Sequence, residues 1–157
     1  MNEQMIKTNS EEETLLLAQN LAKLLKPGDV ITLNGDLGSG KTTFTKGLAV
    51  GLGIEQMITS PTFTIIKEYD GELPLYHMDA YRLEHSEEDI GFTEYFYGDG
   101  ISVVEWSQFI EDFLPEERLN IVIEYVSDNV RRLKFQPIGK HYRNMTNQLL
   151  ANENSPS

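Results

Sequence analysis

The chain has 157 residues, enough for one domain with a sizeable core, and its 39% hydrophobic and 24% charged residues are typical of a globular protein. Its 25 acidic residues outnumber its 13 basic ones, and a net charge of -12 argues against tight, unaided binding to nucleic acid. The lack of cysteine excludes disulfides and thiolate metal sites. The polar N-terminus lacks the apolar core of a signal peptide, and no apolar run approaches the roughly 20 residues of a membrane span, so we expect no membrane contact and a cytoplasmic location.

The first third of the chain predicts a helix, a strand and a second helix. Ser10 and Glu13 are spaced as a capping box, and apolar residues repeat behind them at helical spacing. Lys26-Pro27-Gly28 ends that helix. Residues 30–33 are typical of a short buried strand, and a helix is predicted over residues 41–52.

The remainder predicts further strands and one short helix. The strands are expected at residues 63–69, 75–79, 101–104, 119–125 and 131–135. Ser86 is placed to begin the helix. We therefore predict an α/β protein with a single domain over residues 1–137, in which helices flank a mixed, mostly parallel central sheet with added antiparallel hairpins. Residues 138–157 are expected to form a polar C-terminal tail that is partly disordered.

One segment matches the phosphate-binding pattern G-x-x-x-x-G-K-[ST] in full. The match consists of Gly35, Asp36, Leu37, Gly38, Ser39, Gly40, Lys41 and Thr42, and Thr43 follows it. The glycines let backbone N–H groups converge on an anion, and the next helix directs its positive end there. Lys41 can reach the β- and γ-phosphates, and Thr42 can offer its hydroxyl to Mg²⁺. The motif, between a strand and a helix, predicts a P-loop site for a nucleoside triphosphate with Mg²⁺.

A P-loop also needs a carboxylate near the metal, usually at the end of a neighbouring strand. Glu105 follows a strongly apolar strand, and Asp79 ends one that alternates polar and apolar residues. We assign Glu105 to the metal, directly or through water, and Asp79 to positioning the attacking water, to supporting the metal, or to acting as base. The alternatives are a structural ion pair between Asp79 and Arg82, and an ordinary strand-end carboxylate for Glu105.

Three other residues near these motifs have two interpretations each. Thr62 follows a Pro and could contact the γ-phosphate or Mg²⁺ as a switch residue, or it could belong to a turn that starts a strand. His77 is interpreted as a partly buried histidine bonded to backbone rather than as a catalytic group. Trp106 is interpreted as a core residue rather than as an exposed anchor for a partner.

Absent motifs narrow the class of P-loop protein. A GTPase is expected to carry Asn-Lys-x-Asp and Asp-x-x-Gly, and neither string occurs. A small-molecule kinase brings several arginines to the phosphoryl group, but only Arg82 of the five arginines lies among the candidate site segments. The kinase is therefore the weaker alternative, and a nucleotide-driven accessory subunit remains.

Four blocks together resemble the bacterial TsaE (YjeE) family. They are the P-loop at residues 35–43, Ser-Pro-Thr-Phe at 60–63, His-x-Asp-x-Tyr-Arg at 77–82 and Val-Glu-Trp at 104–106. The resemblance covers about residues 10–135, and the order and spacing of the blocks are far more specific than the P-loop alone.

The resemblance implies a function. Members of that family are small P-loop ATPases that serve the formation of N6-threonylcarbamoyladenosine at position 37 of tRNAs reading ANN codons. They act on a complex of the TsaD and TsaB proteins, and another enzyme makes the threonylcarbamoyl donor. The assignment of ATP as the nucleotide thus rests on the resemblance. Contact with tRNA is expected only through the complex. Hydrolysis of ATP is expected to be slow without the partners.

The resemblance also implies roles for individual residues. Thr42 and Glu105 match the metal-binding pair of the family, and Asp79 matches its catalytic or water-positioning aspartate. Thr62 matches a switch-like threonine and joins Lys41 and Asp79 as a candidate catalytic residue. An arginine near the closing hairpin, Arg132, is expected beside the nucleotide. The sequence leaves the oligomeric state, the rate of hydrolysis and its step in the cycle open.

Overall fold

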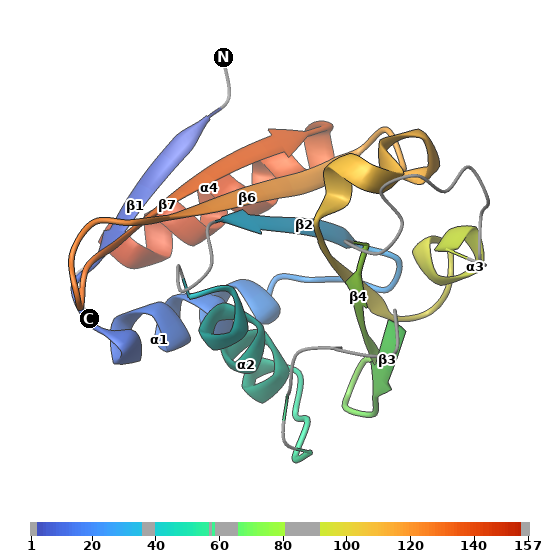
Figure 1. The fold of residues 1–157 in the computed structure, drawn as a ribbon, viewed down its shortest axis with the longest axis horizontal. Helices are drawn as coiled ribbons and strands as arrows, with labels where there is room; N and C mark the ends of the chain where they lie inside the picture. Colours follow the sequence, from blue (N-terminus) through green and yellow to red (C-terminus); the bar gives the residue numbers. More distant parts are fainter. Residues whose placement is uncertain (1–2, 36–39, 57, 59–65, 81–91, 155–157) are drawn as a thin grey trace.

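The computed structural model describes residues 3–35, 40–56, 58, 66–80 and 92–154. Within these residues, seven strands form one sheet in the order β1-β7-β6-β2-β5-β4-β3 (Figure 1). The strands are β1 (Gln4–Thr8), β2 (Val30–Gly35), β3 (Ile66–Tyr69), β4 (Leu75–Asp79), β5 (Ile101–Glu105), β6 (Arg118–Tyr125) and β7 (Arg131–Ile138).

The centre of the sheet is parallel and its two sides are antiparallel. Strands β6, β2, β5 and β4 pair in parallel, while β3 pairs antiparallel with β4, and β7 pairs antiparallel with β6 and β1. This arrangement confirms the predicted mixed sheet with added hairpins. Strand β1 was not predicted. It lies at the edge of the sheet, where four of its five residues are exposed or only half-buried, and only Met5 and Ile6 are apolar.

Helices cover both faces of the sheet. They are α1 (Glu11–Ala22), α2 (Lys41–Gly51), α3 (Phe92–Phe96), the 3-10 helix η2 (Ser107–Phe113) and α4 (Lys140–Asn154). In β2, Ile31 belongs to a core cluster with α1, α2 and α4, and its neighbour Val30 belongs to a second cluster with α3 and η2. Since successive strand residues point to opposite faces, these clusters are the two sides of the sheet. No helix in the described ranges is long and apolar enough to span a membrane.

Helix α1 begins with the capping interaction that its sequence predicts. The Ser10 hydroxyl accepts a hydrogen bond from the Glu13 backbone N–H at 3.1 Å. The Glu13 carboxylate in turn accepts one from the backbone N–H of Asn9, also at 3.1 Å. These bonds satisfy N–H groups that have no partner inside the helix. They also fix the first turn of α1, which faces the pocket described below.

Two glycines let α1 and α2 approach unusually closely. A Cβ atom placed on Gly47 would lie 2.5 Å from the Leu15 carbonyl oxygen and 2.6 Å from the Ala18 Cβ. A Cβ atom on Gly51 would lie 2.5 Å from that of Ala22. The close contact between α1 and α2 therefore depends on the absence of side chains at these two positions. It fixes the position of α2 against α1.

We expect Gly47→Ala to destabilise the protein by about 1–3 kcal/mol, the usual cost of overpacking. The gain of roughly 0.5–1 kcal/mol from alanine in a helix is too small to offset a clash with backbone. Urea unfolding measures the difference. Lys46→Ala, on an exposed position of the same helix, is the control and should stay within about 0.5 kcal/mol of the original. A Gly47→Ala protein as stable as this control would contradict the packing argument.

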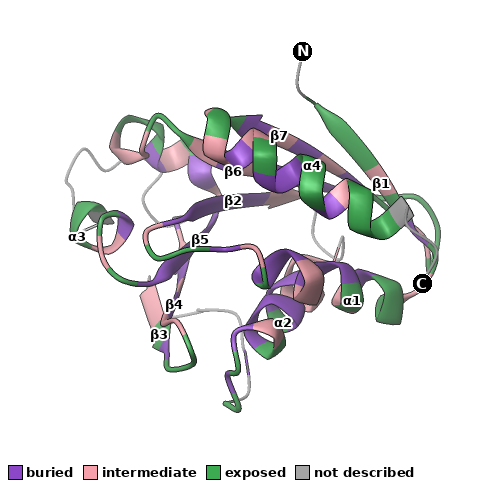
Figure 2. Ribbon diagram, turned by 180° about the vertical axis from the view of Figure 1, so that it is seen from behind, coloured by how far each residue is buried: buried purple, intermediate pink, exposed green. Residues whose placement is uncertain are grey.

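The prediction of a polar, partly disordered tail after Pro137 is wrong for residues 140–154, which form α4. Its buried residues Tyr142, Met145 and Leu149 recur every three or four positions and pack in the first core cluster. Figure 2 shows the buried stripe of α4 turned toward β6 and β7, with its exposed side outward. So few apolar residues give a low average hydrophobicity, and their helical spacing was the signal that could have revealed the helix. Residues 155–157 and the predicted helix start at Ser86 lie outside the described residues.

Candidate functional site

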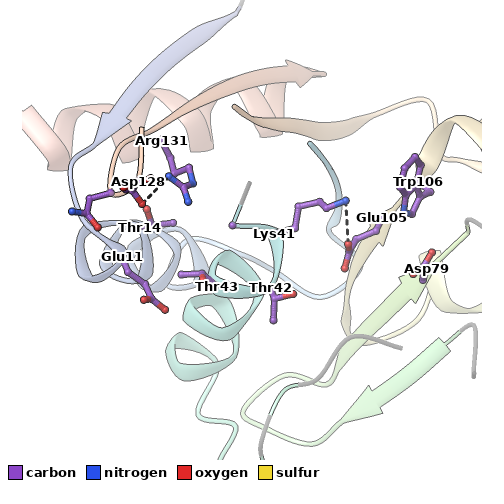
Figure 3. A pocket seen from close by; sticks show the side chains of 12 residues that line it. Glu11, Thr14, Lys41, Thr42, Thr43, Asp79, Glu105, Trp106, Asp128 and Arg131 are labelled. Atoms are coloured by element: carbon purple, nitrogen blue, oxygen red, sulfur yellow. Dashed lines mark hydrogen bonds and ion pairs between the residues drawn. The ribbon is translucent and has the colours of Figure 1, made fainter. Parts of the chain in front are cut away.

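A pocket of about 520 Å³ opens beside the first turn of α2 (Figure 3). Its walls come from the N-terminal turn of α1, the start of α2, the carboxyl ends of β4 and β5, and the turn between β6 and β7. In open α/β sheets, ligands bind outside the carboxyl ends of parallel strands. The pocket occupies this position next to β2, β5 and β4.

The start of α2 has the geometry of an anion site. Gly40 precedes the helix with φ 110°, a left-handed conformation that favours glycine, and its carbonyl accepts the first helical bond from the Phe44 N–H at 2.9 Å. Lys41, Thr42 and Thr43 follow in the first turn, where backbone N–H groups lack helical partners. An anion in the pocket would meet these groups and the positive end of the helix.

The ammonium group of Lys41 lies beside two other residues that line the pocket. Its Nζ lies 3.7 Å from Glu105 Oε1 and 4.9 Å from the centroid of the Trp106 ring. The carboxylate and the aromatic face both attract a cation. Figure 3 shows the Lys41 side chain extending along the start of α2 toward Glu105, so that its charge is held among the residues that line the pocket.

Trp106 has a strained backbone. Its φ and ψ of 57° and 42° make it the only residue other than glycine with a positive φ in the described part of the chain. A bulky residue adopts this conformation at a cost of order 1–3 kcal/mol, and such strain gathers at functional sites. The turn ends β5 directly after Glu105 and stacks the Trp106 ring on Phe109, with centroids 6.0 Å apart. Trp106 is half-buried and lines the pocket, so it is only in part the core residue that was predicted.

The two candidate carboxylates lie opposite each other. Asp79 and Glu105 are register partners at the ends of the parallel strands β4 and β5. Glu105 is buried, with 6% of its surface exposed, whereas Asp79 is half-buried. The two groups thus share the pocket in different environments, which is what two different chemical roles require.

The donor atoms in the pocket are oxygens of the kind that Mg²⁺ prefers: the Thr42 hydroxyl and the carboxylates of Asp79 and Glu105. Among the described residues, no group of three or more His, Asp or Glu side chains is arranged to hold a metal ion by itself. Mg²⁺ is usually bound through one or two carboxylates together with substrate phosphates rather than in an all-protein cage. The residues present therefore fit a metal that arrives with a phosphate ligand.

The carboxylate of Glu105 has a second partner, the imidazole of His77. The Nε2 atom of His77 lies 2.6 Å from Glu105 Oε2, and the imidazole has no solvent-exposed surface. His77 was predicted to be partly buried and bonded to backbone, but its partner is this carboxylate. The pair was not expected, because His77 and Glu105 are 28 residues apart and meet only when β4 pairs with β5.

Comparison with known proteins decides the family. The family model described as "Threonylcarbamoyl adenosine biosynthesis protein TsaE" matches residues 8–133, most of the chain. The chain belongs to the TsaE family. It is 54% identical over 149 residues to the "tRNA threonylcarbamoyladenosine biosynthesis protein TsaE" of Bacillus subtilis, covering 94% of both chains. It is 44% identical to the protein of the same name from Treponema pallidum, over 80% of this chain and 95% of the relative.

A solved structure extends the comparison to the whole fold. The crystal structure of YdiB from Bacillus subtilis superposes with a TM-score of 0.85 at 48% sequence identity, covering 97% of both chains. The TsaE family match ends within β7, whereas this structural match includes nearly all of the chain. Helix α4, which follows β7, lies beyond the part of the chain that the family model matches.

The structure brings together many of the residues that were predicted for a TsaE site. Gly40, Lys41, Thr42, Thr43, Asp79 and Glu105 all line the one pocket. Gly35 is the last residue of β2. Asp36, Leu37, Gly38 and Ser39 of the predicted P-loop, Thr62 and Arg82 lie outside the described residues.

The arginine that lines the pocket is Arg131, one residue before the predicted Arg132. Arg131 lines the pocket, whereas Arg132 is not among the lining residues and its Nη1 lies 3.9 Å from Glu124 Oε1. Neighbouring residues of a strand point to opposite faces, so only one of the pair can face the pocket. From the sequence, strand alternation predicts that Arg131 and Arg132 point to opposite faces of the sheet. Which of the two faces carries the pocket depends on how the whole sheet is assembled.

Arg131 is part of an ordered turn. Its Nη1 donates to the Ser127 carbonyl at 2.7 Å, and its guanidinium lies 4.6 Å from the centroid of the Tyr125 ring. The Tyr125 hydroxyl donates to Asp128 at 2.7 Å, and this hydrogen bond raises the pKa of the Tyr125 phenol. The β6–β7 turn thus presents a positioned cation to the pocket from the side opposite Asp79.

Proposed function

We propose that this TsaE-family protein is a Mg²⁺-dependent ATPase that serves formation of threonylcarbamoyladenosine on tRNA, acting in the cytoplasm as an accessory subunit of a TsaD–TsaB complex. The observation that carries the proposal is the position of Lys41. Its charge is held 3.7 Å from Glu105 at the first turn of α2, in a pocket that Asp79 also lines. A lysine, a hydroxyl and a strand-end carboxylate around a helix N-terminus are the elements with which P-loop proteins bind a nucleoside triphosphate.

The charges of the pocket support a metal requirement. Glu11, Asp79, Glu105 and Asp128 contribute carboxylates to its lining, and only Lys41 and Arg131 contribute cations among the described residues. A triphosphate would be repelled by this surplus of negative charge. Bound Mg²⁺ would offset that charge and bridge phosphate oxygens, with Thr42 and Glu105 as the residues that hold it.

The remaining residues have roles in the attack of water. Lys41 would bind the β- and γ-phosphates and offset charge that develops during transfer. Asp79, opposite Glu105 and more exposed, is placed to orient the attacking water or to accept its proton. A kinase would need several arginines at the phosphoryl group, and in the described part of the chain Arg131 alone lines the pocket.

We expect the partners to control the rate. The protein alone should hydrolyse ATP slowly, and addition of TsaD and TsaB should raise phosphate release by about tenfold or more. Because Arg131 already lies in the pocket, the stimulation should fall below the roughly 10³–10⁵ that an arginine supplied in trans provides. The partners would act by ordering the groups around the water.

Phosphate release is measured with the protein alone, then with TsaD and TsaB, and with tRNA added last. Fast turnover that the partners leave unchanged would refute partner control. Stimulation by tRNA without the partners would also contradict the proposal, since a protein with a net charge of -12 should not engage tRNA unaided. A small phosphorylated product formed by the protein alone would favour the kinase.

A further inference from the structure

The carboxylate of Glu105 has a different partner on each of its oxygens. Oε2 lies 2.6 Å from His77 Nε2, and Oε1 lies 3.7 Å from Lys41 Nζ on the pocket side. We propose that His77 is the positioning residue of this site: it holds one oxygen of Glu105 so that the other faces the pocket and a metal ion. The inference rests on the proposed role of Glu105 as the metal carboxylate.

The side chain of His77 is enclosed within the sheet and its core. His77 is the middle residue of β4, and it pairs in register with Val103 of the parallel strand β5. Both residues are fully buried. A side chain enclosed in this way cannot rotate into solvent without opening the core. The imidazole is therefore a rigid support, whereas a glutamate side chain alone has several rotatable bonds.

The surroundings of the ring also indicate which nitrogen carries the proton. Within the described part of the chain, His77 Nδ1 is buried and has no hydrogen-bond partner. An N–H at this atom would lose its hydration without finding an acceptor, which is costly. An N–H at Nε2 instead donates to the Glu105 carboxylate, at a distance typical of a strong, charge-assisted bond. The geometry thus favours the tautomer in which His77 donates from Nε2.

This hydrogen bond has two consequences for the pocket. It keeps Glu105 Oε2 engaged, so that one oxygen remains directed at the pocket as a ligand. It also prevents both oxygens from turning onto Lys41, which would withdraw the lysine from a phosphate. Residues that orient a metal ligand in this way typically change metal affinity by about 10–100-fold when they are replaced.

The test compares two amides at position 77. Glutamine can place its side-chain nitrogen near the position of Nε2, whereas the asparagine side chain is one methylene shorter and cannot reach Glu105. Mn²⁺ affinity is measured by electron paramagnetic resonance in the presence of a non-hydrolysable ATP analogue. We expect His77→Asn to weaken Mn²⁺ binding by about 10–100-fold and His77→Gln to restore most of it. Metal-free binding of the analogue should change much less.

Ser102→Ala is the control for a polar deletion in the core. Ser102 is fully buried in β5, and its hydroxyl has no hydrogen-bond partner in the described ranges, so its removal should leave Mn²⁺ affinity unchanged. Thermal unfolding shows that each variant is folded. If His77→Asn does not fold, ¹⁵N spectra of the imidazole in the original protein decide: a proton on Nε2 is expected, and an Nε2 without a proton would overturn the proposal.

Three further results would overturn the inference. The first is an unchanged Mn²⁺ affinity in folded His77→Asn. The second is a loss of Mn²⁺ affinity in His77→Gln as large as that in His77→Asn. The third is a loss of metal-free nucleotide binding in His77→Asn as large as its loss of Mn²⁺ binding. Glu105→Gln separates this failure from a failure of the proposed function. If Glu105→Gln weakens Mn²⁺ binding and His77→Asn does not, only the role of His77 is wrong. If Glu105→Gln also has no effect, or the original protein binds no Mn²⁺ with the analogue, the metal assignment itself fails.

Discussion

Lys41→Met is expected to weaken ATP binding by about 100-fold or more, because charged hydrogen bonds to phosphate are worth about 1.5–3 kcal/mol each. Methionine keeps an unbranched side chain that can pack on Trp106, so the substitution removes the charge with little loss of shape. The glycine turn at Gly40 and the start of α2 remain intact. Calorimetric titration of the variant with ATP and Mg²⁺ measures the loss.

The matched control for this prediction is Lys46→Met. Lys46 lies on an exposed position of the same helix, and its replacement makes the same change in net charge. The control should bind ATP like the original protein, and urea unfolding of both variants shows whether the fold persists. If Lys41→Met keeps the affinity of the control, Lys41 is not the phosphate ligand and the proposed site is wrong.

Glu105→Gln and Asp79→Asn are expected to separate metal binding from chemistry. Both substitutions remove a negative charge at nearly constant shape. Glu105→Gln should abolish Mg²⁺-dependent hydrolysis and leave metal-free nucleotide binding in place, because a carboxylate at the metal affects the placement of the metal more than the binding of the phosphates. Asp79→Asn should lower the rate by about 10²–10⁴-fold with metal affinity retained, as expected for loss of a general base.

The two variants control for each other. Steady-state phosphate release across a range of Mg²⁺ concentrations gives the rate and the metal requirement together. If Asp79→Asn removes the metal dependence and Glu105→Gln lowers only the rate, the two assigned roles are reversed. If neither variant changes the metal dependence, the metal is held elsewhere than at the ends of β4 and β5.

The parts of the fold that were predicted have strong local signals. The capping bond between Ser10 and Glu13 depends on residues three apart, and it forms as expected. Strands β6 and β7, which were predicted at residues 119–125 and 131–135, alternate buried and less buried residues, a pattern that is local to each strand. Strand β1 lacks such a signal because it is mostly exposed, and in helix α4 the helical spacing rests on so few apolar residues that the signal is weak.

The glycine turn before α2 and the two strand-end carboxylates could be predicted from the order of residues alone. Gly40, Lys41 and Thr42 are consecutive, and the conformation that glycine allows before a helix start is a local property. How these groups combine follows only from the folded sheet. Placing β5 between β2 and β4 sets Asp79 opposite Glu105 and brings His77 to the same carboxylate. Such pairings join residues far apart in the chain, and they depend on burial across the whole sheet, which no local periodicity encodes.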